Sequence, residues 1–429
     1  MTVLNLIRAI IGLQLRRMGI YSEGSRRNVL ITDDARVKHE VHSTANTHII
    51  YFENQLLALK EDSRPYAMDP DSLSTRGLYD FRGQYSAPTF TAHPKIDLRN
   101  GELITMGDEA KGDATNDVAY YLFDKEGKKL EECWIKTPYV GMMHGMAATK
   151  NWVVFVLIPL ETQPVELLQK GSKHFAWTED KPLTFGILPR RNPKPEDVRW
   201  FHYDNAFYGH TGNAFEGDDG CSWFFEPRSE DPFTHPSGKP KGDGRLETHY
   251  VRWKFDPNAT DFRMEPTQLF DLNGEMPKVD ERFLTKTYNT LFLSIHHPNA
   301  KHSPIGGTYS ALAVADVNTG STLSGLPAGT QPFTRLPSSR DLLKGDGYLI
   351  TIANRRDVKL SCVLILDAKN VEAGSVAIIE LPFRLRNGIH GSWVPRSDFL
   401  SDKDLCDMSG VTEEMRNNFA GATVNPALL

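Results

Sequence analysis

Short apolar runs rich in β-branched and aromatic residues follow one another from residue 45 onward, separated by Gly, Pro, Asn and Asp. Such runs, bounded by turn residues, are typical of β-strands. We predict strands at 48–52, 119–123, 152–158, 200–203, 223–226, 249–255, 291–296, 311–317, 347–352, 362–366 and 375–381. Helical periodicity is confined to the N-terminus and to 164–170. So many strands favour a sandwich, barrel or propeller, and radial repetition most of all.

Composition narrows the class of protein. The chain has 429 residues, with 49 Lys and Arg against 55 Asp and Glu, and 40% of its residues are hydrophobic. This balance excludes a basic nucleic-acid binder and an intrinsically disordered chain. No internal boundary is evident, so we expect a single domain over residues 1–429. The four Cys residues form no CxxC motif, which argues against a disulfide framework and favours a cytoplasmic location.

The N-terminal residues 1–20 are expected to form a helix. Their apolar stretch, Val3 to Leu15, is broken by Arg8 and is too short to span a bilayer. Charges follow the apolar run instead of preceding it, unlike in a secretory signal peptide. An amphipathic surface helix is the simplest interpretation. A mitochondrial presequence and a helix that makes peripheral membrane contact stay open as alternatives.

Four of the fourteen histidines lie among small or apolar residues beside predicted strands, whereas most of the others have polar neighbours. The four are His93, His144, His210 and His390. Taken singly, each is more often a core or turn residue than a metal ligand, and their spacing matches no local metal motif. The spacing does permit one ligand from each of four blades of a propeller. An all-imidazole site would suit Fe, Cu, Zn or Ni.

Several short sequence strings lie around and between these histidines. They are Thr44-Ala45-Asn46-Thr47, Leu56-Leu57-Ala58-Leu59-Lys60-Glu61, Pro65-Tyr66, Tyr79-Asp80-Phe81, Asn213-Ala214-Phe215-Glu216, Gly274-Glu275-Met276-Pro277, Gly345-Asp346-Gly347-Tyr348-Leu349 and His390-Gly391-Ser392-Trp393. Their combination, over about residues 5–396, resembles the carotenoid cleavage oxygenase family. Within that family the chain is most similar to the stilbene-cleaving, lignostilbene-type dioxygenases.

The resemblance implies an all-β fold with few helices: a seven-bladed β-propeller with Fe(II) on its axis. The implied iron ligands are His93, His144, His210 and His390. Glu61 and Glu275 match two glutamates that accept hydrogen bonds from ligand imidazoles. A third glutamate is expected where this chain has Gln331. An amide oxygen can still accept a hydrogen bond but carries no charge, so one ligand is expected to be held less firmly.

The resemblance also implies a reaction, in which O2 splits an alkene into two carbonyl products without an external reductant. Thr47 matches a residue that crowds one open position on the iron. Lys60 matches the lysine that distinguishes stilbene-cleaving members, where it binds a phenol or the phenolate formed from it. The alternative role for Lys60 is an ion pair with Glu61 or another carboxylate. The expected partners are O2 and an apolar or aromatic small molecule.

Two other functions remain open. The first is the same chemistry on a carotenoid or apocarotenoid, against which Lys60 argues. The second is a catalytically inactive propeller that serves as a binding module, or an incomplete sequence. Gln331 favours this second possibility, as does the lack of the Arg-Asn-Gly-Pro-Asn and Phe-Asp-Gly-Asp-Gly strings of the family's N-terminal strands. We therefore expect a propeller that is incomplete at its N-terminus.

Overall fold

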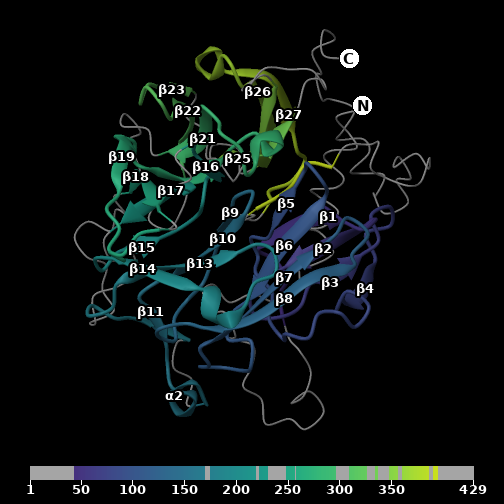
Figure 1. Cartoon of the computed structure of the whole chain (residues 1–429). Coiled ribbons are helices and arrows are strands. Elements are labelled where there is room, and N and C mark those ends of the chain that lie inside the picture. The colour runs from purple at the N-terminus through teal and green to yellow at the C-terminus, as the bar shows by residue number, and fades with distance from the viewer. Residues whose placement is uncertain are drawn as a thin grey trace.

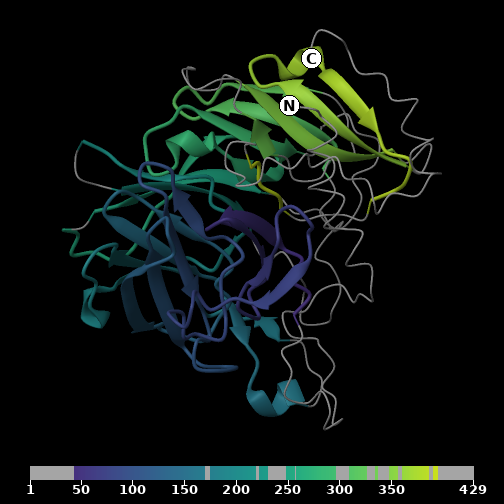
Figure 2. The ribbon, with the colours of Figure 1, turned by 90° about the vertical axis from the view of Figure 1, so that its right-hand side faces the viewer.

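The computed structural model describes residues 43–169, 174–218, 222–229, 248–256, 258–295, 309–325, 334–336, 347–355, 360–385 and 390–394. Within these residues the chain forms antiparallel sheets that follow one another around a central axis, as the order of colours shows (Figure 1). In the view from the side, the C-terminal sheet lies above the ring segment formed by the N-terminal sheets (Figure 2). This radial order defines a β-propeller.

The first three blades come from residues before 204. Blade 1 contains β1 (His48–Phe52), β2 (Gln55–Leu59), β3 (Tyr66–Met68) and β4 (Thr75–Leu78). Blade 2 contains β5 (Lys95–Asp97), β6 (Glu102–Gly107), β7 (Asp117–Phe123) and β8 (Lys129–Lys136). Blade 3 contains β9 (Met146–Ala148), β10 (Trp152–Leu157), β13 (Leu183–Pro189) and β14 (Arg199–Tyr203). A separate two-stranded sheet consists of β11 (Leu160–Thr162) and β12 (Phe175–Trp177).

The remaining blades follow in chain order. Blade 4 contains β15 (Phe207–Tyr208), β16 (Ala214–Glu216), β17 (Ser222–Ser229), β18 (His249–Phe255) and β19 (Thr267–Phe270). Blade 5 contains β20 (Gly274–Lys278), β21 (Thr290–Ile295), β22 (Ala311–Asp316) and β23 (Thr322–Gly325). Blade 6 contains β24 (Thr334–Leu336), β25 (Tyr348–Arg355), β26 (Leu360–Asp367) and β27 (Ser375–Glu380).

Helical structure among the described residues is short. It consists of α2 (Val165–Gln169) and the 3₁₀ turns η1 (Pro195–Asp197), η2 (Glu281–Phe283) and η3 (Val371–Ala373). The N-terminal helix expected within residues 1–20 lies outside the described residues. No helix in the described ranges combines the length and apolar character needed to cross a bilayer.

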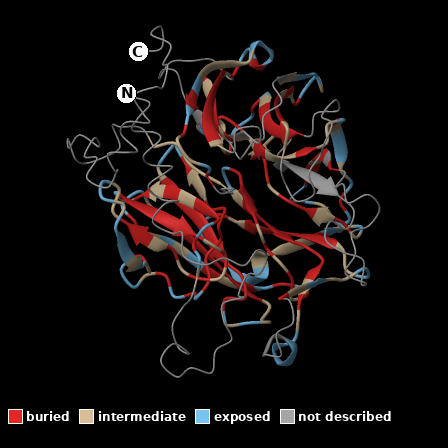
Figure 3. Cartoon of the chain, turned by 180° about the vertical axis from the view of Figure 1, so that it is seen from behind, coloured by how far each residue is buried: buried red, intermediate tan, exposed pale blue. Residues whose placement is uncertain are grey.

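The core lies between neighbouring blades. All residues of β2 and β7 and all but Trp152 of β10 are buried. The middle strands β7 and β10 pack against a neighbouring blade on both faces. The outer strand β8 instead carries alternating exposed positions. Five apolar clusters join consecutive blades from the first to the sixth. Buried residues therefore fill the strands, and exposed residues gather at the turns and the rim (Figure 3).

One segment links the last blade to the first. After β27 the chain returns through residues 390–394, where the His390 N–H donates to the Thr47 carbonyl at 3.0 Å. The Ser392 hydroxyl lies 3.2 Å from His48 Nε2, at the start of β1. These contacts place the last described segment against blade 1. The same contacts hold His390 near the central axis.

The predicted strands are confirmed, with ends shifted by a few residues at most places. The pattern at 48–52 coincides with β1, that at 249–255 with β18, and the helical pattern at 164–170 with α2. The expected number of seven blades is wrong for the described residues, which form five four-stranded sheets and one five-stranded sheet in blade-like order. The number seven was implied by the resemblance alone. The number of sheets that form depends instead on which strands of this chain pair with one another. The single domain over 1–429 stays a prediction.

Candidate metal centre

The four histidines identified from sequence converge on one point. The Nε2 atoms of His93 and His144 lie 3.0 Å apart, those of His144 and His210 3.0 Å, and those of His210 and His390 3.1 Å. All four ligand atoms lie within 4.8 Å of one another. These residues are separated by 51, 66 and 180 positions in the chain, so only the ring of blades brings them together.

Each imidazole is carried by backbone at the start of a blade or at the closing segment. His93 precedes β5, His144 precedes β9, and His210 lies between β15 and β16. Glycines beside two of them permit close packing. A Cβ on Gly145 would lie 2.6 Å from the Tyr208 hydroxyl, and one on Gly209 would clash with Glu275 Oε1. The small neighbours in the sequence therefore have a steric reason.

Two glutamates orient two of the imidazoles. His144 Nδ1 lies 2.7 Å from Glu61 Oε1, and His210 Nδ1 lies 2.8 Å from Glu275 Oε2. Glu61 follows β2 directly, whereas Glu275 lies in β20, where the pairing with β21 shifts register after Glu275. Such a bulge re-aims a side chain. These are the two glutamates that the resemblance places beside ligand imidazoles, and the role of the imidazoles as metal ligands stays a prediction.

These contacts define the protonation of the pair His144 and His210. A carboxylate can only accept, so each Nδ1 carries the proton and donates it. Burial lowers the pKa of His210, against the opposing effect of Glu275, and so favours the neutral ring. When both rings are neutral, each Nε2 carries a bare lone pair, and the two Nε2 atoms lie 3.0 Å apart. Two lone pairs at that distance repel, and a cation between them removes the repulsion.

Burial also favours the neutral form of His93 and His390. Burial, followed by the neighbouring His144, holds the pKa of His93 well below its ordinary value. Burial, followed by His210, does the same for the pKa of His390. Neutral imidazole is the form that binds metal ions. The lowered pKa values of His93, His210 and His390 therefore favour the form that binds metal.

The spacing also fits a first-row metal ion. If imidazole nitrogens bind at about 2.1 Å, two of them are about 3.0 Å apart at a right angle and about 3.4 Å apart at a tetrahedral angle. The observed 3.0 to 3.1 Å therefore matches right angles between neighbouring ligands. Structural zinc sites are tetrahedral, whereas right angles occur in octahedral and square-based sites.

A fifth imidazole, His48, packs beside the cluster and was not singled out from sequence. Its ring centre lies 6.0 Å from that of His93 and 5.6 Å from that of His390. Nδ1 donates to the Ala92 carbonyl at 2.8 Å, so Nε2 is left to accept from the Ser392 hydroxyl. Burial lowers the pKa of His48 to about 3. His48 therefore links Ala92, which precedes His93, to Ser392, which follows His390 by two residues. In the sequence, the only signal for His48 was its place in an alternating strand pattern.

The remaining sequence-predicted residues have different outcomes. Thr47 is buried, and its carbonyl accepts from His390; its predicted effect on an open metal position stays a prediction. Lys60 forms an ion pair, with Nζ 3.0 Å from Asp62 Oδ2. The carboxylate that pairs with Lys60 is thus Asp62, a residue that the sequence analysis did not name. Gln331 lies outside the described residues.

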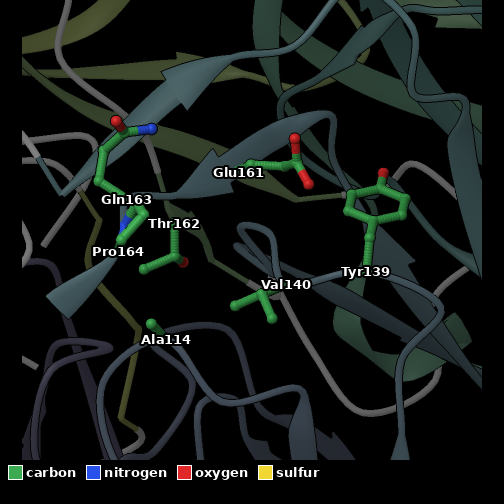
Figure 4. Close-up of a pocket in the computed structure, with 7 residues that line it drawn as sticks. All are labelled: Ala114, Tyr139, Val140, Glu161, Thr162, Gln163 and Pro164. Atoms are coloured by element: carbon green, nitrogen blue, oxygen red, sulfur yellow. The ribbon is translucent and has the colours of Figure 1, made fainter.

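A surface hollow of about 420 Å³ lies elsewhere, beside the two-stranded sheet. Figure 4 shows its lining residues: Ala114, Tyr139, Val140, Glu161, Thr162, Gln163 and Pro164. It contains none of the four converging histidines, which mark the candidate site by their geometry.

A propeller with four converging imidazoles defines a class of metal-dependent oxygenase. The family described as retinal pigment epithelial membrane protein, the carotenoid oxygenase family, matches residues 14–395. The chain belongs to this family.

Individual relatives agree with this membership. Resveratrol cleavage oxygenase 1 of Aspergillus fumigatus is 38% identical over 86% of this chain and 77% of the relative. Carotenoid cleavage oxygenase 1 of Neurospora crassa is 39% identical over 84% of this chain and 72% of the relative. The crystal structure of Pseudomonas brassicacearum lignostilbene dioxygenase superposes with a TM-score of 0.82 at 35% identity, covering 90% of this chain and 82% of that one.

Proposed function

We propose that this protein is a non-haem Fe(II) dioxygenase that cleaves the central alkene of a hydroxylated stilbene or related phenylpropanoid. The observation that carries the proposal is the position of the Nε2 atoms of His144 and His210. They lie 3.0 Å apart, while the Nδ1 atoms of the same rings face Glu61 and Glu275. A cation bound between the two Nε2 atoms accounts for this approach. His93 and His390 complete a set of four nitrogen ligands. Imidazole donors suit Fe, Cu, Zn and Ni, and among these a redox-active metal such as iron is needed for chemistry with O2.

The residues of the site have distinct roles in this proposal. Bound Fe(II) supplies the activation of O2 that alkene cleavage needs. Glu61 and Glu275 hold two ligand rings in one tautomer and increase their basicity. Thr47, buried next to the ring-closing segment, restricts access to one side of the metal. Lys60 binds the phenol end of the substrate.

The substrate class is supported by two relatives. One is named for resveratrol cleavage and the other for lignostilbene, and both names denote hydroxylated stilbenes. The reaction is balanced without a reductant: the C=C bond and the O–O bond break, and each alkene carbon receives one oxygen atom. The products are two aromatic aldehydes.

A carotenoid or apocarotenoid is the second candidate substrate, because the Neurospora crassa relative is named a carotenoid cleavage oxygenase. Lys60 distinguishes the two candidates. A partly buried ammonium that pairs with Asp62 suits a phenol better than a hydrocarbon chain, since polar groups are costly to bury against apolar surface. We further propose a single domain in the cytoplasm, where the four Cys residues stay reduced.

Purified protein loaded with Fe(II) tests the proposal. We expect it to convert resveratrol and O2 into two aldehydes, separated by liquid chromatography, and to turn over β-carotene far more slowly. His210→Ala should lose both iron and activity. The matched control is His202→Ala, because the His202 side chain is exposed on β14. Iron-loaded wild-type protein that cleaves β-carotene but no stilbene would reverse the assignment, and iron-free soluble protein would favour an inactive propeller.

The lysine is tested separately. Lys60→Met should retain iron and lose most of its activity on resveratrol. Unchanged cleavage by this variant would remove the phenol-binding role of Lys60.

A further inference from the structure

We propose that Tyr208 is a positioning residue for the metal centre, and that its hydroxyl fixes the separation of His144 and His210. This hydroxyl lies beside the residues that follow these two histidines in the chain. The proposal rests on the metal-binding part of the proposed function, and it holds for either candidate substrate.

The ring of Tyr208 is held in a fixed place. Tyr208 lies in β15, which pairs with β17, and its side chain is fully buried. The ring belongs to the apolar cluster that joins blades 3 and 4, together with Ala147 of β9 and Ala214 of β16. Close-packed interiors leave little room for a side chain to move. The position of the hydroxyl is therefore set by the core between these two blades.

The hydroxyl of Tyr208 meets both ligand-bearing segments. It lies 2.5 Å from the hydroxyl of Thr211, which follows His210 directly. It also lies against Gly145, which follows His144 directly, because a Cβ on Gly145 would be 2.6 Å from this oxygen. One oxygen atom thus lies next to the residue after each of two ligands whose Nε2 atoms are 3.0 Å apart.

Space, and not backbone conformation, requires glycine at position 145. The φ of Gly145 lies outside the left-handed region that favours glycine, so the backbone would accept alanine. After the hydroxyl, the nearest atoms to an added Cβ are two ring atoms of Tyr208 at 3.6 and 3.8 Å, which is ordinary van der Waals contact. The hydroxyl alone therefore excludes alanine. Since the ring is fixed, an alanine would have to shift the backbone that carries His144.

A small shift of this backbone matters for metal binding. A right angle at the metal needs two Nε2 atoms about 3.0 Å apart, whereas a tetrahedral angle needs about 3.4 Å. The separation observed between His144 and His210 fits the right angle. A displacement of a few tenths of an ångström therefore changes the geometry that the site imposes on the metal. The Tyr208 hydroxyl and Gly145 form a complementary pair, which a double-mutant cycle can test.

The experiment follows metal binding without turnover. Chelator-stripped protein is titrated anaerobically with Co(II), which gives a Kd and a visible absorption spectrum that reports the coordination geometry. We expect Gly145→Ala to weaken Co(II) binding about tenfold and to change the spectrum. In protein that also carries Tyr208→Phe, the same substitution should change the Kd by less than about twofold, because the clashing oxygen is gone. Equal losses with and without the hydroxyl would overturn the inference.

Tyr208→Phe alone should weaken Co(II) binding roughly threefold to tenfold, since Thr211 loses its contact with the phenol oxygen. Tyr121→Phe is the matched control, because the buried Tyr121 hydroxyl likewise contacts a side-chain hydroxyl, that of Ser86, at 2.8 Å. This control should leave the Kd and the spectrum unchanged. A spectrum and a Kd that are the same in Tyr208→Phe and wild-type protein would contradict the role of Tyr208.

Urea unfolding of the metal-free proteins separates positioning from stability. Gly186→Ala is the control for crowding, because its Cβ would lie 2.5 Å from the Trp200 ring in blade 3. It should lower the unfolding free energy but keep the wild-type Co(II) spectrum. If Gly145→Ala protein is insoluble, a soluble double variant that binds Co(II) supports the inference, and an insoluble double variant refutes it. Wild-type protein that binds no Co(II) would refute the metal centre as well, whereas Co(II) binding without alkene cleavage would refute only the proposed reaction.

Discussion

Replacing Glu61 with Gln removes one charge and leaves the shape of the metal centre intact. Glu61 Oε1 lies 2.7 Å from His144 Nδ1, and its side chain is 7% exposed, so solvent screens the interaction little. A glutamine oxygen can still accept the Nδ1 hydrogen and keep the ring in place. What is lost is the increase in ligand basicity that the carboxylate supplies.

Loss of a group that orients a metal-binding imidazole lowers affinity about 10- to 100-fold, or roughly 1.4 to 2.8 kcal/mol. Because Glu61→Gln retains the hydrogen bond, we expect a loss near tenfold, and Glu61→Ala near a hundredfold. Chelator-stripped protein would be titrated anaerobically with Fe(II) or Co(II). Glu126→Gln is the control, since this glutamate is 65% exposed. Equal metal affinity in Glu61→Gln and wild-type protein would refute the reasoning.

Two further perturbations test the supports of the site. His48→Leu removes the link between the Ala92 carbonyl and Ser392. In titrations it should lower the affinity for Co(II) more than Ser392→Ala does, because only the first change frees both backbone segments. A larger loss in Ser392→Ala would contradict this role of His48. Arg190→Met removes one of two arginine partners from each of the buried carboxylates Asp97 and Glu102, which it contacts at 2.8 and 2.6 Å, while Arg99 and Arg191 remain. It should therefore cost roughly 1.5–3 kcal/mol of unfolding free energy in urea titrations. Burial alone would raise the pKa of Asp97, but hydrogen bonds from arginines outweigh it and hold the pKa well below its usual range. The resulting stability is present above about pH 4 and is lost as pH falls further, so acid should destabilise the wild-type protein more steeply than Arg190→Met; parallel pH profiles would argue against this network.

Much of the site could be predicted because its residues lie in short sequence strings that follow one another in the same order as in the family. The four histidines, Glu61 and Glu275 were all identified in this way, and they do meet in the fold. His48 and Asp62 were missed for opposite reasons. His48 looks like one residue of an alternating strand, and Asp62 looks like a turn residue after β2. Their roles depend on Ser392 and on the side-chain direction of Lys60, which no local pattern states.

The amino-acid sequence by itself determined that the predicted runs form strands, to within a few residues of their ends, because β-branched and aromatic runs bounded by turn residues express a local preference. It also determined which residue types are available for metal binding. Only the tertiary structure decided how many sheets pair and which imidazoles face one another across separations of up to 180 residues. It also decided that Lys60 pairs with Asp62. The physical reason is that strand formation is local, whereas the centre forms where blades distant in sequence pack around one axis.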